Sequence, residues 1–236
     1  MIKFFRKIRY ALMEKNKTGK YFKYAIGEIV LVVIGILIAL QINNWNEQRK
    51  NNKTAIYLLS SLKEDLTNDV VELRTCINDA SNMVAMSKAL QSYKLDPVSN
   101  PIDVEKNARN LVDAVSFDIK NITYSEMLNS GSINLLDQGL RKVIAEYYWN
   151  IESYDSNRDN ILQLKRTVIQ LLIQNGVAPF SINEEEMTSL LEDPKLFATI
   201  KQWEYLGKMQ LEIHKEFLKY TQDLIIRIEN EIDMRN

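Results

Sequence analysis

The most distinct hydrophobic pattern lies early in the chain, where Ile29 to Leu40 contains no polar side chain. Taken alone, this run is shorter than the ~20 apolar residues that cross a bilayer as a helix. Tyr21, Phe22 and Tyr24 precede the run and Trp45 follows it, at the positions expected of interfacial aromatic belts. As a helix, this aromatic-flanked stretch spans about 36 Å at about 1.5 Å per residue, which predicts a transmembrane helix.

We predict that this transmembrane helix covers residues 24–45 and is an uncleaved signal anchor. A buried core helix of a soluble protein would not need the aromatic and basic flanks. A cleaved signal peptide requires small residues at both key positions before its cleavage site, but Leu37 stands two residues before Ala39. The anchor therefore explains the pattern better than either alternative.

Basic side chains are concentrated before this helix. The chain contains 30 basic residues (Lys and Arg) and 31 acidic residues (Asp and Glu). Residues 1–27 contain eight of the basic residues and one of the acidic residues, so residues 28–236 contain 22 basic and 30 acidic residues. The positive-inside rule then predicts a basic cytoplasmic arm over residues 1–23 and an extracytoplasmic domain over residues 46–236.

The basic arm has the pattern of an amphipathic helix that lies on a membrane surface. Over residues 2–13, apolar side chains recur every three or four positions and basic side chains fill the positions between them. Nucleic acid is the alternative partner of a basic arm, but the adjacent span already holds this one at the membrane. We therefore predict no nucleic acid, and lipid contact by Phe5, Arg6 and Lys7.

Three residues in or beside the span are candidate contacts for another membrane helix. Glu28 is ionisable, and it either has a function within the membrane or sits at the inner boundary near Lys20 and Lys23, within reach of water. Gly35 and Ala39 form a small-xxx-small pair, the spacing at which two membrane helices approach closely.

The stretch from residue 5 to residue 47 also carries a resemblance. An uncharacterised Gram-negative bacterial family of single-span membrane proteins, a domain-of-unknown-function family, has an opening that resembles FRKIRYALMEKNKTGKYFKYAIGEIVLVVIGILIALQINNWNE. Thr123 to Glu126 and Gly131 to Tyr148 are similar to the family's second recurring stretch. The resemblance implies an inner-membrane anchor and a periplasmic helical domain. The family has no established activity, so no catalytic residue is carried over.

After the span, apolar residues recur every three or four positions, as in amphipathic helices. The pattern predicts a helix that continues from Trp45 to about Leu95, where Pro97 follows. A second long segment begins at Ser132 and ends at Gly176, with a break allowed by the polar stretch 154–160. The last helix starts at the Asp193-Pro194 pair and runs to about Ile232.

Short helices are predicted between the long ones. They cover residues 103–115, a segment from a Thr123/Glu126 capping box to Gly131, and residues 183–191. No segment alternates with a period of two for long enough to predict a strand. The fold class is therefore all-α, with one N-terminal transmembrane helix followed by an elongated bundle of about three long and two to three short helices.

The predicted helix lengths also place the apolar loop 177–182. If the first long helix leads away from the membrane and the second long segment returns, the connection 177–193 lies near the outer leaflet and the last helix runs outward. Phe180 then contacts lipid or packs beside the span. The alternative is that Phe180 closes the end of the bundle core.

Reactive side chains are few. His214 is the only histidine and Cys76 the only cysteine, and both have apolar neighbours at helical spacing. Zinc sites of the His/Cys type and a Ser-His-Asp triad are poorly supported, and Glu184 to Glu186 lacks the spacing of a calcium loop. We predict no catalytic residue, no cofactor and no metal ligand, and therefore no enzyme.

These observations predict a membrane-anchored interaction or scaffold protein of the bacterial inner membrane, with a periplasmic C-terminal domain. Its expected partners are membrane lipid and either another envelope protein or a second copy of the chain. The alternative is a periplasmic ligand sensor that signals through the span. About twenty residues precede the span, so a sensor would require a partner to produce its output.

Overall fold

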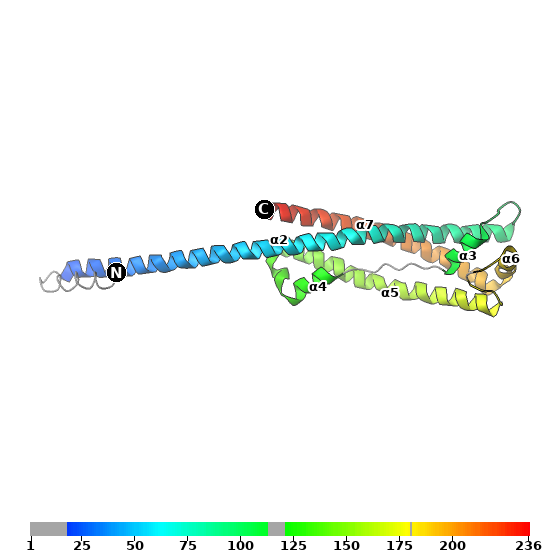
Figure 1. The fold of residues 1–236 in the computed structure, drawn as a ribbon, viewed down its shortest axis with the longest axis horizontal. Helices are drawn as coiled ribbons and strands as arrows, with labels where there is room; N and C mark the ends of the chain where they lie inside the picture. Colours follow the sequence, from blue (N-terminus) through cyan, green and yellow to red (C-terminus); the bar gives the residue numbers. More distant parts are fainter. Residues whose placement is uncertain (1–17, 113–120, 180) are drawn as a thin grey trace. The chain divides into compact units, whose positions relative to one another are not determined.

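The structure is a computed structural model of the chain that describes residues 18–112, 121–179 and 181–236. Every regular element in this part is helical and none is a strand, which confirms the all-α fold class. The chain divides into two compact units, Met1–Thr54 and Ala55–Asn236. Helix α2 contributes to both of them (Figure 1).

Helix α2 runs without interruption from Thr18 to Leu95, over 78 residues. Its sequence contains no proline, so no backbone donor is missing from its hydrogen-bond ladder. The helix ends where Asp96 turns the chain, because the Asp96 carboxylate accepts hydrogen bonds from the backbone N–H groups of Val98 and Ser99, at 3.2 and 3.1 Å. The prediction that the apolar helix continues past Trp45 to Leu95 is confirmed.

The second unit is a helical bundle. Its long helices are the part of α2 after residue 54, α5 (Gln138–Gln174) and α7 (Pro194–Arg235). Its short helices are α3 (Val104–Val112), α4 (Ile122–Asn129), the 3-10 helix η1 (Ser132–Leu135) and α6 (Glu184–Glu192). Helix α5 is continuous through residues 154–160, where the sequence allowed a break.

The described apolar side chains of the bundle form two core clusters. The first core cluster joins the early bundle part of α2, from Ala55 to Cys76, to α4, η1, the first half of α5 and the second half of α7. The second core cluster joins the C-terminal end of α2 to α3, the second half of α5, α6 and the start of α7. Along α7 the buried residues between the two clusters are Gly207, Gln210 and His214.

The membership of the two clusters fixes the direction of each long helix. Leu140 belongs to the first core cluster and Leu172 to the second, so α5 runs in the same direction as α2. Leu196 belongs to the second and Ile228 to the first, so α7 runs in the opposite direction. Figure 1 shows the same arrangement.

This arrangement corrects the predicted return of the segment 132–176. The connection between α5 and α7 lies beside the C-terminal end of α2, where the hydroxyls of Tyr93 and Thr188 are 3.0 Å apart and Lys94 Nζ donates to the Leu191 carbonyl. The predicted direction was wrong because α3 belongs to the second core cluster and α4 to the first, so the chain has already changed ends when α5 begins.

The helix starts predicted from local sequence features agree only in part with the structure. The Asp193 cap is confirmed, and a capping box joins Asn183 to Glu186 at the start of α6. Helix α5 begins later than predicted, because Ser132 starts the 3-10 helix η1 and the side chain of Asp137 caps α5. Helix α4 begins after Asn121, without a side-chain cap, so the predicted Thr123 capping box is wrong.

Candidate functional site

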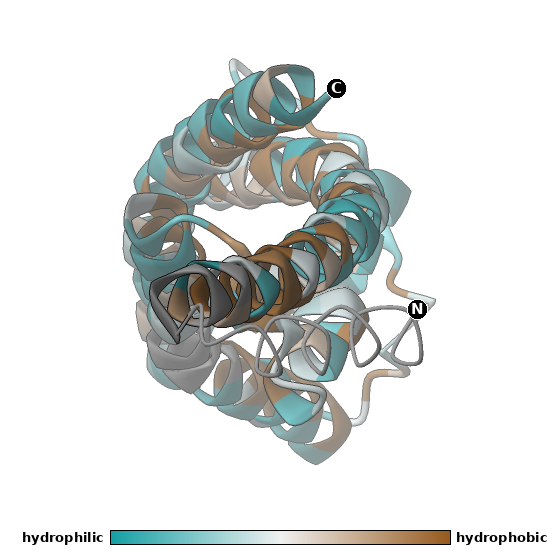
Figure 2. Ribbon diagram, turned by 90° about the vertical axis from the view of Figure 1, so that its left-hand side faces the viewer, coloured by the Kyte–Doolittle hydropathy of each residue, from teal (hydrophilic) through white to brown (hydrophobic). Residues whose placement is uncertain are grey.

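The first unit presents an apolar segment of α2 that no other described element covers. Each residue from Ile29 to Asn51 is exposed, and none of the most apolar 18-residue window, whose mean hydropathy is 2.6, is buried. Figure 2 shows apolar residues in the part of α2 nearest the viewer. By length and composition, this helix is apolar enough to cross a membrane.

Exposure of this segment to water would be costly. Side chains such as Ile34, Leu37 and Ile38 are 50%, 59% and 55% exposed. Transfer of one such side chain from water to an apolar environment is favourable by about 1.5–3 kcal/mol when burial is complete. A contiguous row of them marks a surface that contacts lipid or another protein.

Glu28, Gly35 and Ala39 lie on one face of α2. At about 100° per residue, Gly35 and Ala39 are each within about 20° of Glu28 around the helix. Val32, which lies between them, is about 40° from Glu28. No described side chain stands within 4 Å of a Cβ placed on Gly35. The three residues predicted to contact another membrane helix are therefore aligned on one face, where Gly35 and Ala39 are exposed and Glu28 is half-buried.

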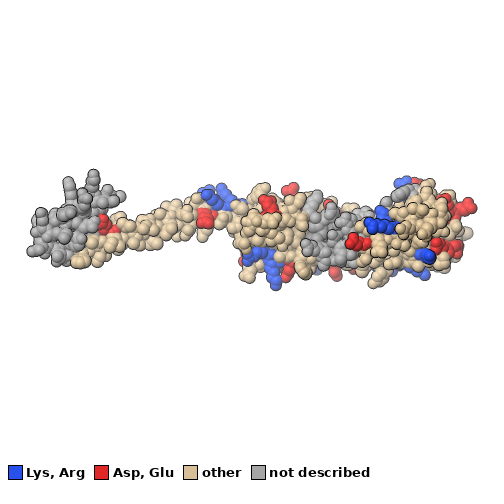
Figure 3. Space-filling model, turned by 90° about the horizontal axis from the view of Figure 1, so that it is seen from below, with Lys and Arg blue, Asp and Glu red and all other residues tan. Residues whose placement is uncertain are grey.

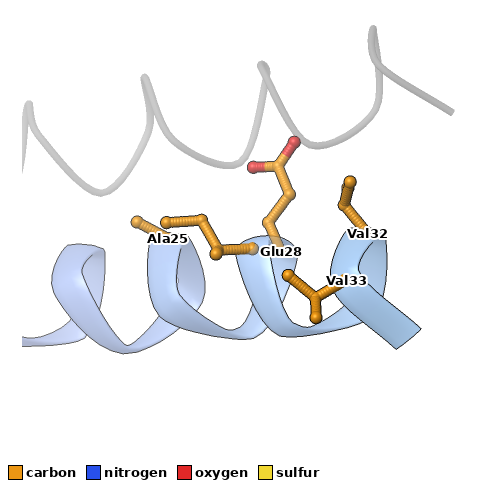
Figure 4. A pocket seen from close by; sticks show the side chains of 5 residues that line it. Ala25, Glu28, Val32 and Val33 are labelled. Carbon is orange, nitrogen blue, oxygen red and sulfur yellow. The ribbon is translucent and has the colours of Figure 1, made fainter. Parts of the chain in front are cut away.

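Glu28 also borders an open pocket. Its described lining spans just over two turns of α2, from Ala25 to Val33. The close-up in Figure 4 shows the Glu28 side chain directed away from the helix axis. The other lining side chains are all apolar: Ala25, Ile29, Val32 and Val33. Among the described residues, the lining combines one carboxylate with apolar side chains.

The residues predicted to contact lipid lie outside the described part of the chain. Phe5, Arg6 and Lys7 precede residue 18, and Phe180 falls between the described ranges 121–179 and 181–236. The neighbours of Phe180 are described: Val177 and Ile182 are buried members of the second core cluster. This loop is therefore joined to the end of the bundle that contains α3 and α6.

A buried polar cluster lies inside the second unit, and it was not predicted from the sequence. The Tyr147 hydroxyl on α5 donates to Asp69 Oδ2 on α2 at 3.1 Å. Thr221 Oγ1 on α7 lies 3.3 Å from the same hydroxyl and donates to it. Asp69, Tyr147 and Thr221 are at most 1% exposed. Asp69 lies one turn after Leu66 and one turn before Leu73. An acidic residue within this apolar stripe was the sequence feature that could have indicated a buried polar cluster.

A second tyrosine extends this cluster toward α4. The rings of Tyr148 and Tyr124 stack with centroids 4.2 Å apart. Burial and the nearby carboxylates of Asp69 and Asp65 raise the pKa of Tyr148 above its usual value. Burial and Asp69 do the same to the pKa of Tyr147. Both hydroxyls therefore stay protonated at neutral pH, and Tyr147 acts as a donor that stabilises the buried carboxylate.

Cys76 and His214 are both buried, at 4% and 6% exposure. Burial, with Asp79 and Glu72 nearby, raises the pKa of Cys76 to about 11, so the thiol is protonated. Burial lowers the pKa of His214 to about 4, so its imidazole is neutral at physiological pH. A nucleophilic cysteine needs the opposite shift, toward the thiolate. The prediction that Cys76 is a small buried side chain is confirmed.

Acidic and sulfur side chains do not gather into a metal-binding group in the ranges that the structure covers. Within residues 18–112, 121–179 and 181–236, no three His, Cys, Asp or Glu side chains converge in an arrangement that could hold a metal ion. Glu184, Glu185 and Glu186 instead occupy the first turn of α6, where negative charge is favoured by the helix dipole.

Comparison with known proteins places these features in a family. The sequence profile of a family of unknown function, DUF6090, matches residues 28–151. The matched segment contains Glu28, Gly35 and Ala39 as well as Asp69 and Tyr147, and it extends into the first half of α5. No curated protein and no solved structure matches the chain. Since the match covers more than half of the sequence, the chain belongs to the DUF6090 family.

Proposed function

We propose that this protein is a membrane-anchored interaction protein without enzymatic activity. In this proposal α2 crosses the bacterial inner membrane once as an uncleaved signal anchor, over residues 24–45. Residues 1–23 lie in the cytoplasm and residues 46–236 in the periplasm. There the helical bundle binds another envelope protein or a second copy of the chain.

The observation that carries the proposal is the exposure of the apolar window of α2. A core helix of a soluble protein would bury such a window, whereas this one has no buried residue at a mean hydropathy of 2.6. The bundle helices differ, since Leu59, Leu62 and Leu66 on the same α2 are fully buried. A lipid bilayer is an environment in which an exposed, uniformly apolar helix is stable.

The proposed orientation rests on charge. Residues 1–27 hold eight of the 30 basic side chains of the chain and one of its 31 acidic side chains. Basic flanks remain on the cytoplasmic side of a membrane, so this imbalance favours a cytoplasmic arm. The non-enzymatic part of the proposal is supported by the burial of Cys76 and His214, which are 4% and 6% exposed, and by the raised pKa that keeps the Cys76 thiol protonated.

Membrane extraction tests the anchor directly. Wild-type protein is expected to stay with the membrane in alkaline carbonate, and the variant Ile34→Arg/Leu37→Arg to be lost from it. Each arginine at the centre of a span disfavours insertion by about 3 kcal/mol. The matched control is Ile226→Arg, which changes a 54% exposed residue of the bundle and should remain membrane-bound. Extraction of the wild type by carbonate would contradict the proposal.

A reporter fused after Asn236 tests the orientation. An enzyme that is active only outside the cytoplasm is expected to work at this position, and one that is active only in the cytoplasm is expected to fail. The opposite pair of results would reverse the topology while leaving the anchor intact. Light scattering of the detergent-solubilised chain then distinguishes a second copy from a different partner protein.

A sensor is the second candidate function, favoured by the shared face of Glu28, Gly35 and Ala39. A signal that passed through the span would require contact with a membrane partner, and this face combines an ionisable group with small residues. Gly35→Leu should then abolish co-purification of the partner. Val30→Leu, at an exposed position about 140° from Gly35 around the helix, should not. Equal co-purification of the two variants would remove the sensor proposal.

A further inference from the structure

Basic side chains follow the apolar segment of α2 as a compact group in the first unit. Arg49, Lys50 and Lys53 are all exposed, and after Glu47 the next acidic residue in the chain is Glu64. Figure 3 shows that a section of α2 without charged atoms ends at a group of blue and red side chains. Residues 28–236 as a whole carry more acidic than basic side chains, so a local excess of basic side chains is unusual within this part of the chain.

The helix aligns two of these cations with Trp45. Arg49 and Lys53 follow Trp45 at intervals of four residues, so all three lie within about 80° around the helix. The Arg49 guanidinium carbon lies 5.9 Å from the centre of the Trp45 ring, a cation–π contact. Glu47 is about 160° from Arg49 and faces away. The result is an exposed face with one aromatic ring and only positive charge.

The height of this face along α2 matches the headgroup layer of a bilayer. Trp45 lies about 4.5 Å beyond Ile42, Arg49 about 10 Å and Lys53 about 16 Å. A headgroup layer extends about 5–8 Å beyond the hydrocarbon core, and long basic side chains reach back toward it by about 6 Å. The Arg49 side chain therefore reaches the layer, and the Lys53 ammonium ends about 2 Å outside it, close enough to attract phosphate electrostatically. Trp45 is 61% exposed, as an interfacial anchor requires.

We propose that Trp45, Arg49 and Lys53, with Lys50 at the edge of the same face about 60° from Lys53, form a binding site for the phosphate groups of anionic phospholipids, in the leaflet on the bundle side of the membrane. This proposal rests on the membrane anchoring proposed above. The indole lies at the boundary of the hydrocarbon layer, and the guanidinium and ammonium groups donate hydrogen bonds to phosphate oxygens. The continuity of the face with the apolar segment favours lipid over a soluble anion.

The test measures lipid selectivity in the full-length chain. The protein is reconstituted in phosphatidylcholine vesicles and probed with spin-labelled phosphatidylglycerol or spin-labelled phosphatidylcholine. Each cation near an anionic surface strengthens association by about fivefold, so wild-type protein should prefer phosphatidylglycerol by at least that factor. The preference should decrease at high salt, which screens exposed charges.

Variants assign the preference to this face. Arg49→Gln/Lys50→Gln/Lys53→Gln should reduce the preference for phosphatidylglycerol by about fivefold or more. The control Lys106→Gln/Lys142→Gln/Lys219→Gln removes the same charge from the bundle and should retain the wild-type value. Because all three changed residues in the first variant are exposed, its helical content should be unchanged, as circular dichroism can verify.

The outcomes separate this inference from the anchor. If wild-type protein floats with the vesicles but the first variant and wild type show the same preference, the headgroup site is refuted and the anchor stands. If wild-type protein does not float with the vesicles, both proposals fail. If the three cations control self-association in phosphatidylcholine vesicles and leave lipid preference unchanged, the face binds a second copy and the lipid site is refuted.

Discussion

The Tyr147 hydroxyl donates a hydrogen bond to Asp69 Oδ2 at 3.1 Å, in the interior between α5 and α2. The two residues are 78 positions apart in the chain, and both are almost fully buried. A buried carboxylate is costly unless donors satisfy it. This hydrogen bond therefore helps to determine how α5 packs against α2, because a shift along the helix would separate the donor from the acid.

Tyr147→Phe removes this donor without changing the ring that packs against Phe217. We expect the free energy of unfolding to decrease by about 1–3 kcal/mol, since a buried carboxylate loses a hydrogen bond. Thermal unfolding of the full chain in detergent, followed by near-ultraviolet circular dichroism, measures the change. Tyr57→Phe is the control, because Tyr57 is 67% exposed. Equal effects of the two changes would contradict a structural role for the buried pair.

The burial of His214 predicts that the free energy of unfolding depends on pH. Its pKa in the folded chain is about 4, below the usual 6.5, because burial disfavours the charged ring. Between about pH 4 and pH 6.5, His214 is therefore protonated in the unfolded chain and neutral in the folded chain. The free energy of unfolding consequently decreases as the pH falls from about 6.5 to about 4. The loss should approach about 3 kcal/mol. His214→Gln should flatten the stability curve in this pH range, and an unchanged slope would contradict the assignment to His214.

Asp193 predicts a capping effect at the start of α7. Its carboxylate accepts hydrogen bonds from the backbone N–H groups of Lys195 and Leu196, at 2.7 and 3.4 Å, and from the Asn175 amide at 3.1 Å. Asp193→Ala should decrease stability by about 1 kcal/mol, because the first turn of α7 loses its cap. Asp193→Asn keeps an oxygen acceptor and should lose much less. Chemical denaturation of both variants is the measurement, and an equal loss would show that capping is not the cause.

The close approach of α7 to α2 at Gly207 predicts that a larger side chain at this position would cause a steric clash. A Cβ at this position would lie 2.9 Å from Val84 Cγ2 and 3.0 Å from Met83 Cε. Alanine in place of glycine favours a helix by about 1 kcal/mol, but overpacking costs about 1–3 kcal/mol. We expect Gly207→Ala to lower the melting temperature and Val84→Ala to recover part of the loss in the double variant. Additive losses in the double variant would exclude the contact with Val84 as the cause.

Local patterns predicted local structure well. Exposure of Ile29 to Leu40 and burial of Leu59, Leu62 and Leu66 follow from spacing along one helix, which the sequence contains directly. The Asp193-Pro194 start of α7 follows from the chemistry of two adjacent residues. These features depend on neighbours within a few positions, so the periodicity of the chain was sufficient.

Long-range relationships were not predicted. The direction of α5 depends on pairs such as Tyr147 with Asp69, and the position of α6 depends on Thr188 beside Tyr93, 95 positions away. An amphipathic stripe specifies that a helix has a buried face, but it does not specify which helix covers that face or in which direction it runs. The prediction from helix lengths alone placed the connection 177–193 at the wrong end of the bundle.

The division of the core into two clusters gives the bundle two regions where hydrogen exchange can begin independently. Helices α3 and α6 contribute apolar side chains only to the second core cluster, and α4 and η1 only to the first. The backbone amides of α6 can therefore become accessible to solvent while those of α4 remain protected, and the reverse also holds. A partner that binds one end would slow exchange at that end first, so the pattern of protection would locate its contact within the bundle.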